Sequence, residues 1–290
     1  MKLCRILIYF LIIIFLSVSF GNNKIEKIIF TSQRDGNKQI YLMDINGNNQ
    51  ENISKNKFNE FQATLSPDGS KIVFVSDMSG NNEIYLRYVQ SNNIVPITQN
   101  HHDNLYPIFS YDGEKIAFAS DIDGDYDIYI FKLQDNEIEK ITNNNEDDIC
   151  PSFSPDNKNI IFVSEKDGNK EIYLFNLEEK TEKRLTFNVS NDLYPFFSPD
   201  GNMITFTSER DGNREIYVMD KSGLSQKRLT KNIAHDYWSR YSPDGRKIVF
   251  ASYRDGNSEI YIMDSEGRDI MRLTFENAWD SEPYWGFLKY

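Results

Sequence analysis

The chain repeats itself every 44 residues, and this period constrains its fold more than any other feature of the sequence. An Ile-Tyr pair, a phenylalanine, a serine and a glycine all recur at this step. The pairs end at Tyr41, Tyr85, Tyr129, Tyr173, Tyr217 and Tyr261, and the phenylalanines are Phe30, Phe74, Phe118, Phe162, Phe206 and Phe250. Six copies fill residues 27–290, which are 264 residues and therefore six times 44. Such a period is typical of propellers and other arrays of one repeated unit.

Each unit contains four short segments with the length and alternation of β-strands, which we call A, B, C and D. In the unit from Phe196 to Thr230 they are PFFS, MITFTS, EIYVMD and QKRLT. Proline fixes the backbone angle of the A–B turn, Pro199-Asp200-Gly201. Glycine tolerates the left-handed backbone that the B–C turn, Asp211-Gly212-Asn213, needs as a tight hairpin.

Six equal units of four antiparallel strands predict an all-β fold, a six-bladed β-propeller over residues 27–290. A sandwich does not need six equal units, and a parallel β-helix would have much shorter coils. Lys27 opens in strand B of the first unit, and the chain ends on EPYWGFLKY, which matches strand A. If PYWGF pairs beside KIIFTS, the N- and C-terminal strands close the ring inside one blade and remove its free sheet edges.

The composition and the N-terminus indicate an acidic, exported protein. The formal net charge is -12, which argues against nucleic acid as a partner because a phosphate backbone demands a basic surface. Residues 1–21 carry two cations and then an apolar run from Ile6 to Phe20, which predicts a secretory signal peptide. The run is short for a membrane span, so we favour cleavage over a retained anchor and expect no stable span afterwards. Cys150 is then the lone cysteine, and we expect it to be buried and apolar.

One B–C turn is unusually acidic, since residues 121–127 are DIDGDYD. Aspartates on alternate residues suggest a calcium loop, but Gly124 comes fourth, whereas an EF-hand-type loop has its glycine sixth. The other five copies keep the turn and lose carboxylates. The repeat therefore favours a hairpin, and a calcium site in this one blade is the alternative.

The predicted functional site is one mouth of the central tunnel, where the D–A and B–C loops should open on the same face and strand A should line the tunnel. One position of the D–A loops is a carboxylate in five of six copies: Glu60, Asn104, Asp148, Asp192, Asp236 and Asp280. The favoured role of these side chains is to cap their own turns. The alternative is an acidic mouth that attracts a basic segment or a cation.

Two neighbouring D–A loops add aromatic residues, a composition typical of binding hot spots. An exposed tryptophan would support a partner site, and a buried one would mean packing alone. His101 and His102 raise the question of a metal, but their loop lies opposite that of His235 in a six-fold ring, so we predict no metal site. The residues of the two loops are His235, Asp236, Tyr237, Trp238, Trp279 and Asp280.

The units FSPDGNMITFTSERDGNREIYVMD and YSPDGRKIVFASYRDGNSEIYIMD resemble the repeats of the TolB family of periplasmic propeller proteins. The resemblance extends from Lys27 to the end of the chain. It implies a periplasmic location, where TolB proteins belong to a complex that bridges the inner membrane, peptidoglycan and outer membrane. In that family the propeller holds the peptidoglycan-associated lipoprotein. The separate N-terminal domain of the family is not expected here, because only Asn22 to Glu26 separate the predicted signal from the first blade.

No phosphate-binding loop, zinc motif or catalytic triad is visible in the sequence. The sequence therefore predicts a monomeric, non-enzymatic scaffold of the cell envelope that uses no cofactor. We expect it to bind a partner protein or peptide at the acidic and aromatic mouth. The alternative is an exported propeller enzyme acting on polysaccharide, with His101, His102 or His235 as base or ligand.

Overall fold

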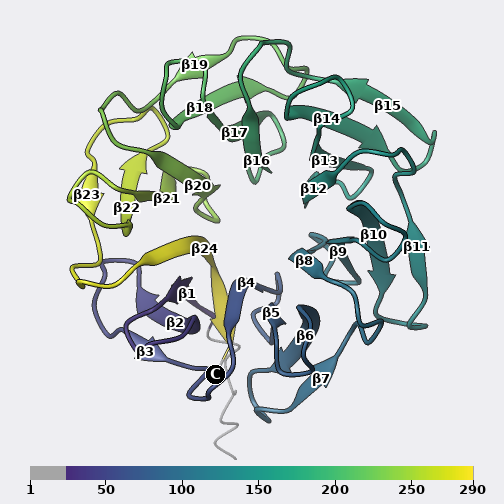
Figure 1. The fold of residues 1–290 in the computed structure, drawn as a ribbon. Helices are drawn as coiled ribbons and strands as arrows, with labels where there is room; N and C mark the ends of the chain where they lie inside the picture. Colours follow the sequence, from purple (N-terminus) through teal and green to yellow (C-terminus); the bar gives the residue numbers. More distant parts are fainter. Residues whose placement is uncertain (1–23, 290) are drawn as a thin grey trace, which may run out of the picture.

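The computed structural model describes residues 24–289, and the regular secondary structure in this range consists of β-strands alone. The strands form six four-stranded antiparallel sheets arranged as the blades of a ring (Figure 1). This arrangement confirms the predicted six-bladed propeller. The predicted signal peptide, residues 1–21, lies outside the described residues. Residues 24–289 contain no helix with the length and apolarity of a membrane span.

We number the blades 1 to 6 around the ring and give the strands of each blade from the tunnel outward. Blade 1 contains β24 (Asp280–Lys289), β1 (Lys24–Ser32), β2 (Gln39–Asp44) and β3 (Glu51–Asn52). Blade 2 contains β4 (Glu60–Leu65), β5 (Lys71–Ser76), β6 (Glu83–Tyr88) and β7 (Ile94–Pro96). Blade 3 contains β8 (Asn104–Phe109), β9 (Lys115–Ser120), β10 (Asp127–Lys132) and β11 (Ile138–Lys140). Blade 4 contains β12 (Asp148–Phe153), β13 (Asn159–Ser164), β14 (Glu171–Asn176) and β15 (Thr181–Arg184). Blade 5 contains β16 (Asp192–Phe197), β17 (Met203–Ser208), β18 (Glu215–Asp220) and β19 (Lys227–Arg228). Blade 6 contains β20 (Asp236–Tyr241), β21 (Lys247–Ser252), β22 (Glu259–Asp264) and β23 (Met271–Arg272).

In blade 5 the two middle strands have the predicted sequences, MITFTS for β17 and EIYVMD for β18. The innermost strand, β16, begins three residues before the predicted PFFS, because Asp192 already pairs with Ser208. The outermost strand, β19, has only two residues. An outermost strand has a pairing partner on one side only, so its ladder ends early.

The ring closes in blade 1, where β24 pairs antiparallel with β1 from Lys24 opposite Lys289 to Ser32 opposite Asp280. Trp285 of PYWGF lies opposite Ile28 of KIIFTS, which confirms the predicted closure. In Figure 1 the yellow β24 accordingly lies beside the purple β1. One sheet therefore joins the two ends of the described chain.

Every innermost strand contains a bulge near its third residue, where the pairing register shifts. The bulged residue has a left-handed backbone, with φ between 53° and 58° in all six blades. Such a bulge redirects a side chain away from its normal place on the sheet. The six residues are Gln62, Tyr106, Cys150, Tyr194, Trp238 and Glu282.

The repeated phenylalanines form the core between blades, and each is at most 1% exposed. Each ring lies 5.6–6.0 Å from the ring of the repeated tyrosine on the next strand. Phe118 and Tyr129 of blade 3 belong to one apolar cluster with Phe61 and Val75 of blade 2. Adjacent blades therefore pack on one another through these phenylalanines, and each contributes about 1.5–3 kcal/mol by burial.

Candidate functional site

The six side chains predicted at the D–A loops lie inside the ring wall. Each is the first residue of an innermost strand, or of its A segment, and is at most 1% exposed. The alternative of an exposed acidic mouth built from these side chains is therefore wrong, because a partner cannot reach them. In five blades an asparagine four residues earlier bonds to this side chain, as Asn188 Nδ2 does to Asp192 Oδ2 at 2.7 Å. The residues that order their own loops in this way are Glu60, Asn104, Asp148, Asp192 and Asp236, and Asp280 takes the same buried position in blade 1.

A second buried polar residue begins strand C of the preceding blade at each junction between blades. At the junction of blades 2 and 3, Asn104 Nδ2 donates to Glu83 Oε2 at 2.9 Å. At the four junctions from Asp148 onward both residues are carboxyl residues, and one oxygen of each aspartate lacks a hydrogen-bond partner. The strand C residues, each at most 1% exposed, are Gln39, Glu83, Asp127, Glu171, Glu215 and Glu259.

Burial of two like charges changes the acidity of these junctions. Burial raises the pKa of Asp148 to about 6. Burial also raises the pKa of Asp280 to about 6, and the nearby Glu259 charge acts in the same direction. Both carboxyl groups therefore take up a proton in a pH range where exposed aspartates stay ionised.

Arginines of the B–C loops partly compensate the junction charge. Arg210 Nη2 lies 2.8 Å from Asp192 Oδ2, and its Nε donates to Ser208 Oγ at 2.7 Å. Ser208 is one of the repeated serines that end strand B, and its hydroxyl also accepts the Arg210 backbone N–H at 3.4 Å. The repeated serine thus orders the following turn, as its position predicts.

Four of the predicted residues do meet at one mouth of the tunnel, which we call the upper mouth. His235, Tyr237, Trp238 and Trp279 line a cavity of about 600 Å³ on the face of the D–A and B–C loops. His235 is exposed and Trp279 is half-buried, whereas Trp238 is only 9% exposed. The rest of the wall comprises Gln62, Tyr106, Tyr194, Glu209, Arg214, Tyr253 and Glu282.

Trp238 crosses the tunnel below the upper mouth. Its ring lies 4.2 Å from that of Tyr194 in the adjacent blade and 5.9 Å from that of Tyr106 in the opposite blade, and both pairs are stacked. We call these three side chains the aromatic bridge. Because Trp238 is buried, its main role is packing. The aromatic bridge that it forms with Tyr106 and Tyr194 spans the tunnel and is the floor of the upper mouth.

One side of the upper mouth is held by a short polar network. Arg214 Nε donates to Glu209 Oε1 at 2.9 Å, and Asn191 Nδ2 donates to Glu209 Oε2 at 2.8 Å. The Arg214 backbone N–H donates to His235 Nδ1 at 3.1 Å. Hydrogen bonds from Arg214 and Asn191 lower the pKa of Glu209 against the effect of its burial, so this carboxylate is ionised at neutral pH.

The other side of the same face carries three carboxylates that sequence reasoning did not assign to the mouth of the tunnel. Asp103, Asp121 and Asp147 are half-buried and surround Tyr126. Burial first, and then the charges of these three carboxylates, raise the pKa of Tyr126 to about 12. We call Asp103, Asp121 and Asp147 the acidic sector.

The acidic turn at residues 121–127 does not gather its carboxylates. Asp121 Oδ1 accepts the Asp103 backbone N–H at 2.8 Å, whereas Asp123 and Asp127 both pair with Lys140. His102 Nδ1 lies 3.5 Å from Asp121 Oδ1, on the blade opposite His235. Among residues 24–289 there is no group of three or more His, Cys, Asp or Glu side chains that could hold a metal ion.

Exposed apolar side chains extend from the D–A loops of the same face. Phe187 is 73% exposed and Phe275 is 71% exposed, and Val189 and Ile233 are essentially fully exposed. We call these four residues the apolar loop tips. They lie in the three consecutive loops that enter blades 5, 6 and 1, next to the His235 and Trp279 side of the upper mouth.

Sequence reasoning missed the bridge, the Arg214 network and the loop tips. The 44-residue step carried a signal for the bridge and for the loop tips. Tyr106, Tyr194 and Trp238 occupy one repeat position. Phe187 and Phe275 share another repeat position, at which the other blades have polar residues. Cys150, the bridge-level residue of blade 4, is 4% exposed, and burial raises its pKa to about 12, which confirms an inert, buried thiol.

A family model described as the TolB beta propeller domain matches residues 22–107, 105–230 and 194–287. The chain belongs to the TolB β-propeller family. A comparison with curated proteins finds no match. Among solved structures, TolB from Acinetobacter baumannii has a TM-score of 0.79 at 24% identity, covering 90% of this chain and 66% of that protein. This chain therefore spans slightly less than two thirds of the length of that TolB.

Two further solved structures with this fold are a TolB candidate and an enzyme. A TolB candidate from Agrobacterium tumefaciens has a TM-score of 0.73 at 20% identity, covering 92% of this chain and 99% of that one. Oligogalacturonate lyase from Vibrio parahaemolyticus has a TM-score of 0.58 at 13% identity, covering 87% of this chain and 73% of the lyase. Identities this low show the shared fold alone, and the same fold carries both TolB proteins and enzymes.

Proposed function

We propose that this TolB-family propeller is an exported, non-enzymatic scaffold of the cell envelope that binds a segment of a partner protein at its upper mouth. The observation that carries the proposal is the half-ring of exposed apolar loop tips beside an aromatic mouth with a closed floor. Large exposed apolar side chains gathered on one face mark interaction sites in soluble proteins. Aromatic anchors in a pocket are typical of the residues that dominate binding energy.

The charges of the upper mouth favour one orientation of the partner. The acidic sector lies across the ring from the aromatic and apolar side, so a bound segment would place basic residues over Asp103, Asp121 and Asp147. Its apolar or aromatic residues would then lie against Trp279 and the loop tips. Electrostatic complementarity of this kind fixes register and speeds association.

The cellular location and the partner are part of the same proposal. The apolar run in residues 1–21 supports export, and membership of the TolB family supports the periplasm. The peptidoglycan-associated lipoprotein is the first partner to test, with this chain acting as a monomer. The separation of His102 from His235 on opposite blades supports binding over polysaccharide cleavage.

The experiment places a photoreactive phenylalanine analogue at Trp279 and, as a control, at Ile138, which is exposed on the outer strand β11. In intact envelopes we expect a crosslink to one envelope protein from position 279 and none from position 138. In a Phe187→Ser, Ile233→Ser background the crosslink should fall at least about tenfold, because each substitution is expected to remove about 1–2 kcal/mol of binding free energy. Equal crosslinking from both positions, or no effect of the two serines, would contradict the proposal.

A further inference from the structure

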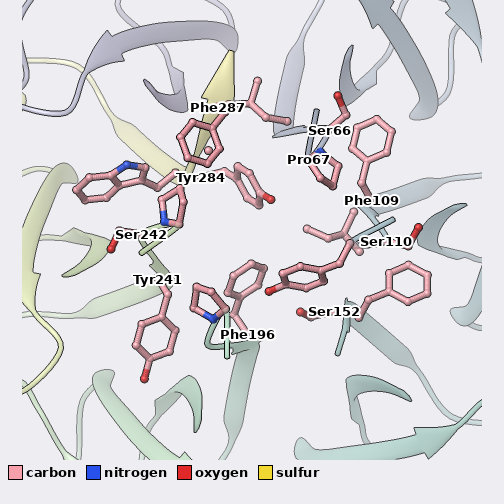
Figure 2. Close-up of a pocket in the computed structure, with 18 residues that line it drawn as sticks. Ser66, Pro67, Phe109, Ser110, Ser152, Phe196, Tyr241, Ser242, Tyr284 and Phe287 are labelled. Carbon is pink, nitrogen blue, oxygen red and sulfur yellow. The ribbon is translucent and has the colours of Figure 1, made fainter. Parts of the chain in front are cut away.

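Below the aromatic bridge the tunnel widens into a second cavity on the opposite face of the ring, which we call the lower chamber. It has a volume of about 250 Å³ and is lined in part by residues of the A–B turns. Figure 2 shows the side chains that line it. A gap of only about 30 Å³ lies between this chamber and the bridge. The walls are mainly apolar, and their aromatic residues include Phe109, Phe153, Tyr241, Trp285 and Phe287.

One layer of side chains forms the inner end of the lower chamber. These side chains are the fifth residues of the A segments, one from each blade: Thr64, Ile108, Ser152, Phe196, Arg240 and Tyr284. Ser152 and Phe196 line the lower chamber, Thr64 and Arg240 line the adjoining gap, and Ile108 and Tyr284 line both. Figure 2 shows Tyr284, Phe196 and Ser152 around the central space. The layer contains hydrogen-bond donors and no carboxylate, an unusual composition in a chain with a net charge of -12.

Arg240 is the cation of this layer, and it has no anionic partner. Its Nη1 donates to Ser239 O at 2.9 Å, and its guanidinium lies 4.8 Å from the Phe196 ring centre. Within residues 24–289, none of the ion pairs between an arginine and a carboxylate involves Arg240. Burial lowers the pKa of Arg240 to about 10, so the side chain stays charged at neutral pH. An enclosed cation without a counter-ion is energetically unfavourable, so binding of an anion beside Arg240 would be stabilising.

Two neutral donors share the layer with Arg240. Ser152 is 2% exposed, and its Oγ has no hydrogen-bond partner. Burial raises the pKa of Tyr284 to about 12, so its hydroxyl keeps its proton. No hydrogen bond from the Tyr284 hydroxyl is formed within the described range of the chain. A buried hydroxyl without a partner costs stability, and an acceptor from a ligand would remove that cost.

We propose that the lower chamber binds a small organic anion that has a carboxylate on an apolar body. The carboxylate accepts hydrogen bonds from Arg240, Tyr284 and Ser152, and the apolar body lies among the aromatic walls. A carboxylate suits the layer because it only accepts hydrogen bonds and can bind a guanidinium with both oxygens. The apolar walls select against small hydrated anions, which have no surface to bury there.

The test is calorimetric titration of the purified chain with octanoate, octanol and acetate. We expect octanoate to bind, and octanol and acetate to bind at least about tenfold more weakly. Octanol lacks the carboxylate, and acetate lacks the long apolar chain. Arg240→Gln should weaken octanoate binding at least about tenfold. Arg246→Gln is the matched control, because the Arg246 side chain is 87% exposed and pairs only with Asp244 across 3.9 Å.

Thermal melting keeps this test independent of folding. Arg240→Gln should keep the melting temperature of the parent or raise it, because it removes an uncompensated cation. Ser152→Ala should weaken octanoate binding by a smaller factor, about threefold to tenfold, with little change in melting temperature. No octanoate binding up to about 1 mM, or equal binding of octanol and octanoate, overturns the proposal. Unchanged octanoate binding by a folded Arg240→Gln variant overturns it as well.

Discussion

Replacing Asp148 by asparagine should stabilise the propeller at neutral pH. The junction of blades 2 and 3 shows how, because Asn104 there bonds both to Glu83 and to Asn100. Asp148 faces the equivalent surroundings in the next blade, with Asn144 Nδ2 on its Oδ2 at 2.6 Å and no arginine partner. The asparagine removes the buried charge of Asp148, and its amide can donate toward Asp127, whose Oδ2 pairs with Lys140 Nζ at 2.7 Å.

The magnitude follows from the acidity of Asp148. Its pKa is raised from 3.8 to about 6, and one pKa unit corresponds to about 1.4 kcal/mol. Ionising Asp148 in the folded protein therefore costs up to about 3 kcal/mol at pH 7. Because the folded-state pKa is the higher one, stability from this group is present below about pH 4 and is lost as pH rises through about 6.

The assay is urea unfolding of the parent and of Asp148→Asn at pH 4 and pH 7. We expect the variant to be up to about 3 kcal/mol more stable at pH 7 and nearly equal to the parent at pH 4. Asn104→Asp is the reciprocal control and should lose stability at pH 7. A variant that is no more stable than the parent at pH 7, or equally stabilised at both pH values, would refute the reasoning.

Three other predictions concern the ring itself. Gly223→Ala should cost about 2–5 kcal/mol, because its backbone is left-handed and the new Cβ would lie 2.5 Å from Leu185 O. Gly212→Ala has nearly the same φ and open space around it, so it should cost only about 1–2 kcal/mol, and equal losses in chemical denaturation would disprove the packing argument. Trp238→Ala should cost about 3–5 kcal/mol in the same assay, and a loss below about 1 kcal/mol would show that the bridge contributes little. Deletion of residues 280–289 removes the innermost strand of blade 1 and should abolish the cooperative melting transition, whereas retained cooperativity would mean that closure is dispensable.

The sequence predicted the fold well because its information is repeated six times. Turn chemistry and strand alternation in one copy could be checked against five others, which fixed β17 and β18 residue by residue. The same repetition predicted the closing of the ring by Trp285 and its neighbours.

The site was harder to predict because exposure depends on single residues of a loop. Asp148 and its equivalents are buried, whereas the residues one position earlier are half-buried, as Asp147 is, or exposed, as His235 is. A strand bulge decided which aromatic side chains enter the tunnel, and alternation cannot foresee a bulge. The unpaired Arg240 could not be recognised from sequence, since the absence of a partner is a property of three-dimensional surroundings.

The bulge in every innermost strand lets the chain vary the lining of its tunnel independently of the residues that specify its blades. The blades are specified by residues that recur at each step, while the bulged position is held by its backbone and accepts chemically unrelated side chains. The six residues there are a glutamine, two tyrosines, a cysteine, a tryptophan and a glutamate, and none is β-branched, as a left-handed backbone requires. One substitution at this level can therefore change what the tunnel admits while the register of all six sheets stays the same.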